Sequence, residues 1–337
     1  MSLARAPSPM RRVLLPATLA ATPPPLGARV HEFGGLTMGT TWRVRLVAGL
    51  CLHREPVSRA IQAALDEVVA QMSTWERGSD LCRFNRAAPG TWHALPDAFC
   101  EVLSCALDVA RHSGGAFDPT AGELVDAWGF GPIARAGLPD ADALVQARTR
   151  GGWARLESAD GRLLQAGGLA LDLSAIAKGF GVDLVARRLA ALGFESHFVE
   201  VGGELRGTGM KPDGQPWWVR LEEPENAPAG GQTLLALHGL AIATSGDYRR
   251  WFEHDGVRYS HTIDPRDGRP IRHGLASVSV IHAECMLADA WSTALNVLGP
   301  DDGLALAQQR GLAARFVIRR GAAFDERTSA EFDRFLQ

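Results

Sequence analysis

Three oxygen-bearing side chains stand out in an otherwise apolar stretch of the sequence, residues 286–298. Asp289, Ser292 and Thr293 are spaced i, i+3 and i+4, so they share one face if the stretch is a helix. A carboxylate buried on such a helix is costly unless it is paired or binds a metal, and hard oxygen ligands suit Mg²⁺. The residues alone leave two interpretations open. One is a magnesium site, and the other is a carboxylate that complements the dipole of its own helix while the threonine bonds back to the helix.

A second candidate is the segment DLSAIAKG at residues 172–179. Asp172 ends an expected strand, Ser174 is a favourable N-cap, and a helix follows. Lys178 then falls in the first helical turn, where the helix dipole disfavours a cation. A phosphate bound at the helix N-terminus would explain the lysine. The segment therefore predicts either a phosphate site or a capped helix with a solvated lysine.

His261 is the third candidate, in the segment YSHTIDP on an expected strand that ends in an Asp-Pro turn. Because imidazole titrates near neutral pH, this histidine is a candidate general base, and the alternative is a hydrogen-bonded structural histidine. The segment VGGELRGTG, residues 201–209, places four glycines after a strand. Glycines there either let the backbone approach a ligand closely or form a tight turn.

Composition and charge are those of an ordinary globular protein. The chain has 337 residues, of which 46% are hydrophobic and 22% are charged, and its net charge is −3. A nucleic-acid-binding protein usually carries a basic excess, so we expect no nucleic-acid partner. The sequence has no phosphate loop, no GxGxxG after a strand, no nucleophile elbow and no HExxH motif. Its five cysteines form no CxxC pair, which argues against a disulfide framework and a structural zinc site.

The first 30 residues differ from the rest of the chain. Arg11 and Arg12 precede a short apolar stretch that Pro16 interrupts, so we expect residues 1–30 to be a disordered tail or a weak signal-like segment. No cysteine follows to carry a lipid anchor, and no apolar run reaches the length of a transmembrane helix. We expect residues 31–337 to form the functional domain. The compartment stays open between the cytoplasm and the periplasm or inner-membrane surface.

Periodicity of the apolar residues predicts the elements that must position these clusters. Helices are expected at residues 56–75, 95–112, 140–148, 176–192 and 286–298, with another after Asp302. Strands are expected at residues 36–47, 196–201, 217–221, 233–237, 240–243, 258–263, 276–282 and 314–319. The order is not a regular βαβ alternation. It predicts a single compact α+β domain with mixed or antiparallel sheets and packed helices.

Together these segments resemble the ApbE family of Mg²⁺-dependent FAD:protein FMN transferases. The resemblance covers about residues 33–320, and the motifs occur in the family's order. The matching stretches are residues 38–40, 72–75 with 81–85, 115–118, DLSAIAKG, VGGELRGTG, ATSGDYRR, SHTIDPRDGRPI and ADAWSTALNVLG.

The resemblance implies covalent flavinylation, in which FMN passes from FAD to a Thr or Ser hydroxyl of an acceptor protein and AMP is released. It implies that Mg²⁺ is held by Asp289, Thr293 and the backbone carbonyl of Ala175, and that His261 takes the acceptor's proton. Ser292 stands where some members carry a further metal-binding Asp, so we count it in the metal set but expect that ligand to be either lost or water-mediated. Positions that match FAD-contacting residues are Met38, Trp75, Ala116, Phe117, Asp118, Asp172, Lys178 and Ile263.

Within that set the resemblance gives Trp75 and Phe117 the aromatic surfaces for stacking and lets Lys178 face a phosphate. Trp75 replaces the more common Tyr, and Asp267 replaces a usual Thr and is expected to point away. Two alternatives remain: a Mg²⁺-dependent FAD pyrophosphatase that yields FMN and AMP, and a non-catalytic FAD-binding protein. The resemblance implies that the acceptor is a redox protein or a subunit of a respiratory membrane complex. The sequence names neither the acceptor nor the oligomeric state.

Overall fold

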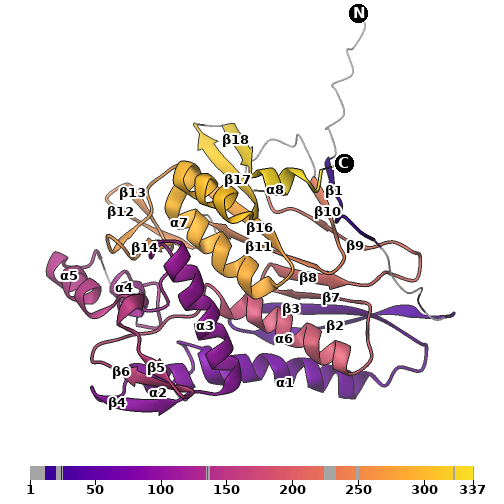
Figure 1. Ribbon diagram of the computed structural model, residues 1–337, viewed down its shortest axis with the longest axis horizontal. Helices are drawn as coiled ribbons and strands as arrows, with labels where there is room; N and C mark the ends of the chain where they lie inside the picture. Colours follow the sequence, from indigo (N-terminus) through magenta and orange to yellow (C-terminus); the bar gives the residue numbers. More distant parts are fainter. Residues whose placement is uncertain are drawn as a thin grey trace, which may run out of the picture.

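The computed structural model describes residues 12–19, 24, 26–133, 135, 137–223, 233–247, 250–321 and 323–336. Within these ranges the largest sheet has eight strands in the order β18-β17-β16-β11-β8-β7-β3-β2 (Figure 1). Their bounds are β2 Arg29–Thr37, β3 Thr40–Ala48, β7 His197–Val201, β8 Glu204–Thr208, β11 Leu240–Gly246, β16 Leu275–His282, β17 Ala313–Arg320 and β18 Ala323–Thr328. All neighbouring pairs in this sheet are antiparallel. The expected α+β class is confirmed.

Both faces of this sheet are covered, because its strands carry apolar side chains on alternate sides. In β3, Val44 and Leu46 join the larger core cluster, whereas Val47 joins a second cluster. In β16, Val280 belongs to the larger cluster and Ile281 to the second. A strand buried on both sides needs an almost continuous apolar sequence, and β16 is buried along nearly all of its length.

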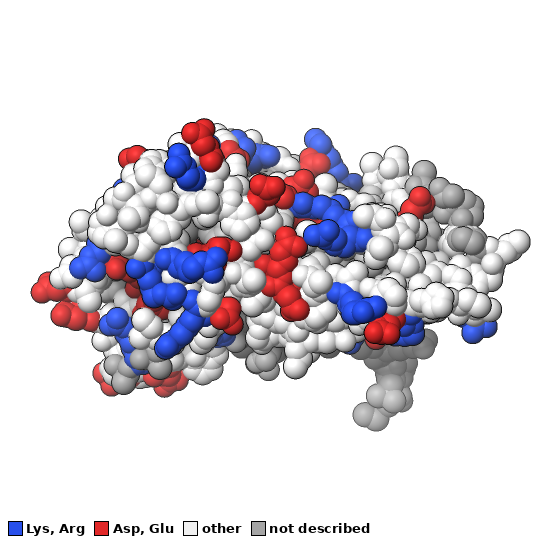
Figure 2. Space-filling model, turned by 90° about the horizontal axis from the view of Figure 1, so that it is seen from below, with Lys and Arg blue, Asp and Glu red and all other residues white. Residues whose placement is uncertain are grey.

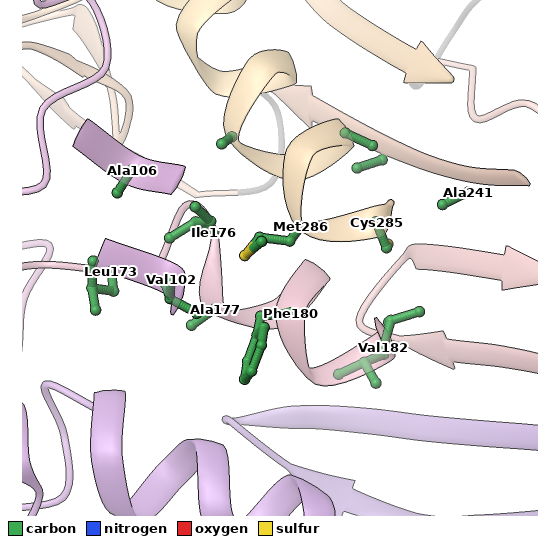
Figure 3. Packing of buried hydrophobic residues seen from close by; sticks show 14 of the residues in the cluster. Val102, Ala106, Leu173, Ile176, Ala177, Phe180, Val182, Ala241, Cys285 and Met286 are labelled. Carbon is green, nitrogen blue, oxygen red and sulfur yellow. The ribbon is translucent and has the colours of Figure 1, made fainter. Parts of the chain in front are cut away.

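Four helices lie on the side of the sheet that holds the larger cluster; three of them pack against the sheet, and the fourth, at residues 97–112, packs on other helices (Figure 1). They are α1 Arg54–Met72, α3 Asp97–His112, α6 Ala177–Ala191 and α7 Cys285–Arg310. Figure 3 shows how they meet: Val102 of α3, Phe180 of α6 and Met286 of α7 lie close together in the layer between the helices. This layer fixes the N-terminal ends of α6 and α7 relative to one another, and those ends carry the candidate residues.

The second face is covered by a smaller sheet in the order β1-β10-β9 and by α8 Ala330–Asp333. The strands are β1 Arg12–Leu14, β10 Thr233–Leu237 and β9 Trp217–Arg220. Strand β1 lies inside the segment for which we expected a disordered or signal-like tail. It pairs in parallel with β10, and Leu15 N–H donates to the Phe335 carbonyl at 2.8 Å. Residues 1–11, 20–23 and 25 of that segment lie outside the described residues.

The remaining elements lie at the periphery. Two short helices, α4 Gly122–Ala127 and α5 Ala141–Arg150, precede the 3₁₀ turn Trp153–Arg155. The small sheets are β4 Thr91–Ala94 with β6 Arg162–Gln165 and β5 Ser158–Ala159, β12 Trp251–His254 with β13 Val257–Ser260, and β14 Ile263–Asp264 with β15 Arg269–Pro270. Helix α2, Asp80–Asn85, completes the set, and together with α4 and β18 it was not expected from the sequence.

One predicted strand and one predicted helix cap differ from the structure, each for a clear physical reason. The strand expected at residues 36–47 is a hairpin, because Met38 (φ 49°) and Gly39 (φ 71°) are both left-handed and form a two-residue turn. Ser174 does not cap the following helix: α6 begins at Ala177, and its cap position, Ile176, offers no side-chain hydrogen bond. The helices expected at 286–298 and after Asp302 are the two halves of α7, which is kinked at the non-helical Gly299 and at Pro300.

The surface carries both signs of charge. On the face seen in Figure 2, Lys and Arg side chains predominate toward the left of the view, and Asp and Glu side chains lie near the centre and among the basic ones. All five cysteines are free. In the part of the chain that the structure describes, no helix combines the length and the apolar character needed to cross a membrane.

Candidate active site

The N-terminal ends of α6 and α7 cap one another. Asp183 of α6 accepts hydrogen bonds from the N–H groups of Cys285 (3.0 Å) and Met286 (2.9 Å) at the start of α7. In return, Asp289 Oδ2 of α7 accepts the Gly179 N–H of α6 at 3.0 Å. Neither helix has a capping side chain of its own. Each carboxylate thus satisfies orphan donors of the other helix and lies at its positive end.

Gly179 is the residue that lets these helices approach so closely. A Cβ atom at this position would lie 2.4 Å from the Cys285 carbonyl oxygen and 2.8 Å from Asp289 Cβ. Its N–H donates to Asp289 rather than to the carbonyl four residues earlier, which is that of Ala175. The Ala175 carbonyl and the Asp289 carboxylate therefore lie at the same helix start. The Asp289 carboxylate thus contacts the chain one residue beyond the segment 172–178.

Hydroxyl groups extend this oxygen cluster along α7. Ser245 Oγ, on β11, lies 2.7 Å from Ser292 Oγ and 3.0 Å from Thr293 Oγ1. Ser292 Oγ in turn donates to the carbonyl of Asp289 at 2.9 Å. Asp289 is 3% exposed and Ser292 is fully buried, whereas Thr293 keeps partial exposure. The cluster offers one carboxylate together with hydroxyl and carbonyl oxygens.

Lys178 has a carboxylate partner. Its Nζ lies 2.5 Å from Oε1 of Glu204, a residue that is 1% exposed at the start of β8. Glu204 follows the turn of Gly202 (φ 61°) and Gly203 (φ 104°), so the glycine-rich segment forms a hairpin turn that delivers this carboxylate to α6. The interpretation of Lys178 as a solvated residue is wrong. A cation in the first turn of α6 balances the buried charge of Glu204.

His261 is held by the backbone of a neighbouring segment. Its Nδ1 lies 2.9 Å from the Arg250 carbonyl, which also accepts the His261 N–H at 3.1 Å. A carbonyl only accepts, so in the neutral ring Nδ1 carries the proton and Nε2 is the basic nitrogen. The ring meets the edge of Phe130 with centroids 6.3 Å apart. The next residue, Thr262, makes a long contact of 3.5 Å to Asn296, two turns beyond Asp289 on α7.

A hollow of about 430 Å³ lies between α4, α5 and the turn after β14. Asp118 lines it together with Arg148 and Arg266. Asp118 accepts hydrogen bonds from Thr120 N–H (2.8 Å) and Trp153 N–H (3.1 Å), and burial raises the pKa of its carboxyl. The segment that follows Asp118 is hydrogen-bonded to the segment that precedes α6, because the Asp172 N–H donates to the Pro119 carbonyl at 2.9 Å. Asp172 itself accepts the Ser174 N–H at 2.7 Å.

The other residues matched to flavin contacts differ in exposure. Trp75 is 61% exposed after the end of α1, with its N–H bonded to Ser73 Oγ at 3.1 Å. Phe117 is 3% exposed within the larger core cluster, and Ala116 is 1% exposed, so the Trp75 ring is the open aromatic face of the expected pair. Met38 Cε lies 3.2 Å from the place of a Cβ on Gly181, one turn into α6. Ile263 is buried in a separate cluster beside Trp128.

Sequence reasoning missed several residues of this region. Asp126 of α4 has its pKa raised to about 6, by burial first and then by the nearby charge of Asp172. Asp183 and Ser245 belong to the cluster through contacts with α7 that span about a hundred and about fifty residues of sequence. Glu204 stood inside the recognised glycine-rich segment, where the signal was present but was not assigned. Tyr248 and Arg249 of the segment ATSGDYRR lie outside the described residues.

Comparison with known proteins identifies the class. A profile of the ApbE family matches residues 38–316. The FAD:protein FMN transferase of Klebsiella pneumoniae is 36% identical over 323 residues, which is 94% of this chain and 92% of the relative. The protein of the same name from Vibrio cholerae serotype O1 is 38% identical over 312 residues, 91% of this chain and 93% of the relative.

Solved structures agree with these relatives. The flavinyl transferase ApbE of Pseudomonas stutzeri, in its apo form, matches with a TM-score of 0.85 at 42% identity over 91% of this chain and 97% of its own. The flavin transferase ApbE from Vibrio cholerae matches with a TM-score of 0.85 at 37% identity over 92% and 100%. Fold and relatives together define an enzyme of the transferase class. The chain belongs to the ApbE family.

Proposed function

We propose that the chain transfers FMN from FAD to a Thr or Ser hydroxyl of an acceptor protein, with Mg²⁺ as cofactor and AMP as the second product. The names of the relatives support FMN transfer. The observation that carries the proposal is the oxygen cluster at the start of α7, in which the Asp289 carboxylate contacts the start of α6 and the Thr293 hydroxyl lies one helical turn further on. An alcohol can attack the bridging phosphates of a dinucleotide only where the negative charge of the phosphates is neutralised.

The donor set of the cluster fits Mg²⁺. In the described part of the chain, no three His, Cys, Asp or Glu side chains gather into a group that could hold a metal. The donors at α6 and α7 are instead the Asp289 carboxylate, the Thr293 hydroxyl and the Ala175 carbonyl, all hard oxygens. Mg²⁺ commonly binds through one or two carboxylates and completes its shell with water and substrate phosphates. When bound, the ion would neutralise charge on the FAD pyrophosphate and on the leaving AMP.

The chain's own residues supply the remaining chemistry. His261 Nε2, basic because Nδ1 donates to Arg250, takes the proton of the acceptor hydroxyl. The hydroxyl oxygen forms a bond to the phosphorus on the FMN side, the bond from that phosphorus to the bridging oxygen breaks, and AMP leaves with the bridging oxygen. Trp75 presents an open ring on which a planar ring of FAD can stack.

Product analysis tests the proposed reaction. The protein is incubated with FAD and MgCl₂ together with a flavin-free preparation of a respiratory membrane-complex subunit whose mature form carries covalent FMN. We expect intact mass spectrometry to show the acceptor heavier by one FMN residue, with AMP formed in equal amount. Formation of free FMN and AMP with an unchanged acceptor would instead establish the pyrophosphatase. Absence of AMP would leave a binding protein.

Replacement of the proposed base tests the role of His261. The variant His261→Ala should bind FAD normally and transfer FMN roughly 10²–10⁴-fold more slowly, because only proton removal is lost. Flavin fluorescence measures binding, and single-turnover transfer measures the rate. An unchanged transfer rate would make His261 a structural residue.

A further inference from the structure

The hydroxyls of Thr293, Ser245 and Ser292 form a continuous chain that ends on a backbone carbonyl. The steps are 3.0 Å from Thr293 Oγ1 to Ser245 Oγ, 2.7 Å from Ser245 Oγ to Ser292 Oγ, and 2.9 Å from Ser292 Oγ to the carbonyl oxygen of Asp289. Two of these residues come from α7 and one from β11. The chain therefore crosses from the helix to the sheet and returns.

The carbonyl at its end sets the direction of every proton in the chain. A carbonyl oxygen accepts but cannot donate, so Ser292 uses its hydroxyl proton there. At the 2.7 Å contact Ser245 must then donate to Ser292, which consumes the Ser245 proton. At the 3.0 Å contact Thr293 must donate to Ser245. The Thr293 lone pairs consequently point away from the sheet, toward the partly exposed side of that residue.

We propose that Ser245 is a positioning residue that holds the Thr293 hydroxyl with its lone pairs toward a divalent cation, and that Ser292 closes this chain instead of ligating the ion. The proposal rests on the proposed function, because the cation is the Mg²⁺ of that site. Burial supports the assignment, because Ser292 is 0% exposed whereas Thr293 keeps partial exposure. This differs from the expectation that Ser292 is itself a metal ligand.

Strand β11 and its neighbour β16 provide a matched control. Thr244 Oγ1 and Ser279 Oγ lie 2.8 Å apart, and both residues are buried. Thr244 precedes Ser245 on β11, so alternation places this hydroxyl pair on the opposite face of the sheet. Ser279→Ala therefore removes a buried hydroxyl bond of similar length from the same strands without touching α7.

The test measures metal affinity directly. Mn²⁺ serves as the probe, and free Mn²⁺ is followed by electron paramagnetic resonance with and without FAD, with no acceptor present. We expect Ser245→Ala to bind Mn²⁺ roughly 10–100-fold more weakly than the parent, as is typical when a residue that orients a ligand is lost. Ser279→Ala should keep the parental affinity. Ser292→Ala should weaken binding less than Thr293→Val, which removes the ligand.

Each other outcome decides against part of the proposal. Parental Mn²⁺ affinity in a folded Ser245→Ala variant would overturn the positioning role. An effect of Ser292→Ala equal to that of Thr293→Val would make Ser292 a ligand. Failure of the parent protein to bind Mn²⁺ at all would remove the metal from the proposed function and this inference with it. If Ser245→Ala does not fold, Ser292→Ala is used instead. Without the Ser292 hydroxyl, the Ser245 proton can turn toward Thr293 and disturb the orientation of the Thr293 hydroxyl. Parental Mn²⁺ affinity in Ser292→Ala would then overturn the proposal.

Discussion

At the scale of single residues, the site contains charged side chains at positions that would be unfavourable without a partner. Asp289 is a carboxylate on a buried helix, and the structure gives it the Gly179 N–H as a partner for one oxygen. Lys178 is a cation at the wrong end of a helix dipole, and the structure gives it Glu204. Both anomalies were readable from the sequence, because each involves one residue and its own element. The partners were not, because Gly179 and Glu204 reach them only through the fold.

Two substitutions at residue 289 should separate its capping role from its proposed metal role. Asp289→Asn keeps a carbonyl oxygen for the Gly179 N–H but loses the charge, so it should remain folded and lose Mg²⁺-dependent transfer. Asp289→Ala should lose transfer and also about 1 kcal/mol or more of stability, since a capping acceptor disappears. FAD affinity should change little in either. Normal transfer by Asp289→Asn, measured alongside its thermal melting, would show that the metal is not held there.

The ion pair of Lys178 and Glu204 leads to a prediction about stability in which a double variant serves as the control. Lys178→Met keeps the carbon stem but leaves the Glu204 carboxylate, 1% exposed, without its 2.5 Å cation. Breaking a buried pair in this way typically costs about 3–5 kcal/mol, whereas neutralising both partners costs far less. Urea unfolding should therefore show that Lys178→Met with Glu204→Gln is more stable than Lys178→Met alone.

Kinetics of the same variants then address the substrate. If Lys178 also faces a phosphate of FAD, the double variant should keep a raised apparent KM for FAD even though its stability has recovered. A double variant as unstable as the single one would mean that the pair does not account for the lysine. A parental KM for FAD in the double variant would mean that Lys178 acts only in the ion pair.

At the scale of elements, the helices were easier to predict than the places where they touch. Apolar spacing located α1, α3, α6 and the first half of α7 to within a few residues, because each buries one face. The hairpin at Met38 was missed because the turn depends on backbone angles at one non-glycine residue, which no apolar pattern reports. The reciprocal caps of α6 and α7 were missed for the same kind of reason. A capping side chain can come from any segment, and Ser174 was only a capping residue type close to the helix in sequence.

The close approach of α6 and α7 predicts a specific effect at Gly179. Gly179→Ala places a methyl group 2.4 Å from the Cys285 carbonyl, so the helices must separate. Overpacking of this kind costs roughly 1–3 kcal/mol, and here it should also weaken Mn²⁺ binding, since Asp289 moves away from the start of α6. Gly49→Ala is the control, because a Cβ there meets nothing within 4 Å. Equal melting temperatures and Mn²⁺ affinities for the two variants would contradict the contact.

At the scale of the whole molecule, the sheet buries polar groups as well as apolar ones, and this couples its stability to pH. His197 on β7 is 2% exposed, and burial lowers its pKa to about 4. Between pH 6.5 and 4 the unfolded chain therefore takes up a proton at His197 that the folded protein does not. Stability falls on acidification through this window, by at most about 3.5 kcal/mol, because each unit of pKa shift corresponds to about 1.4 kcal/mol.

Asp126 acts in the opposite sense over nearly the same window. Its pKa is raised to about 6, so the folded protein holds a proton between about pH 4 and pH 6 that the unfolded chain has released. The contribution of Asp126 is present below pH 4 and is lost as the pH rises to 6. It is the smaller of the two, because Asp126 is only partly buried and solvent screens its charge. The two residues therefore offset one another in the parent protein.

Replacing either residue should reveal the pH dependence of stability that the other residue contributes. In Asp126→Asn the acid lability from His197 is no longer offset, so the free energy of unfolding should fall more steeply than in the parent as the pH drops from 6 to 4. In His197→Gln the slope should change in the other direction, and stability should hold or rise on acidification. Urea unfolding at half-unit pH steps measures both slopes, which remain informative even if a variant is less stable at every pH. Identical slopes in the parent and both variants would mean that neither buried group titrates differently in the folded and unfolded chains.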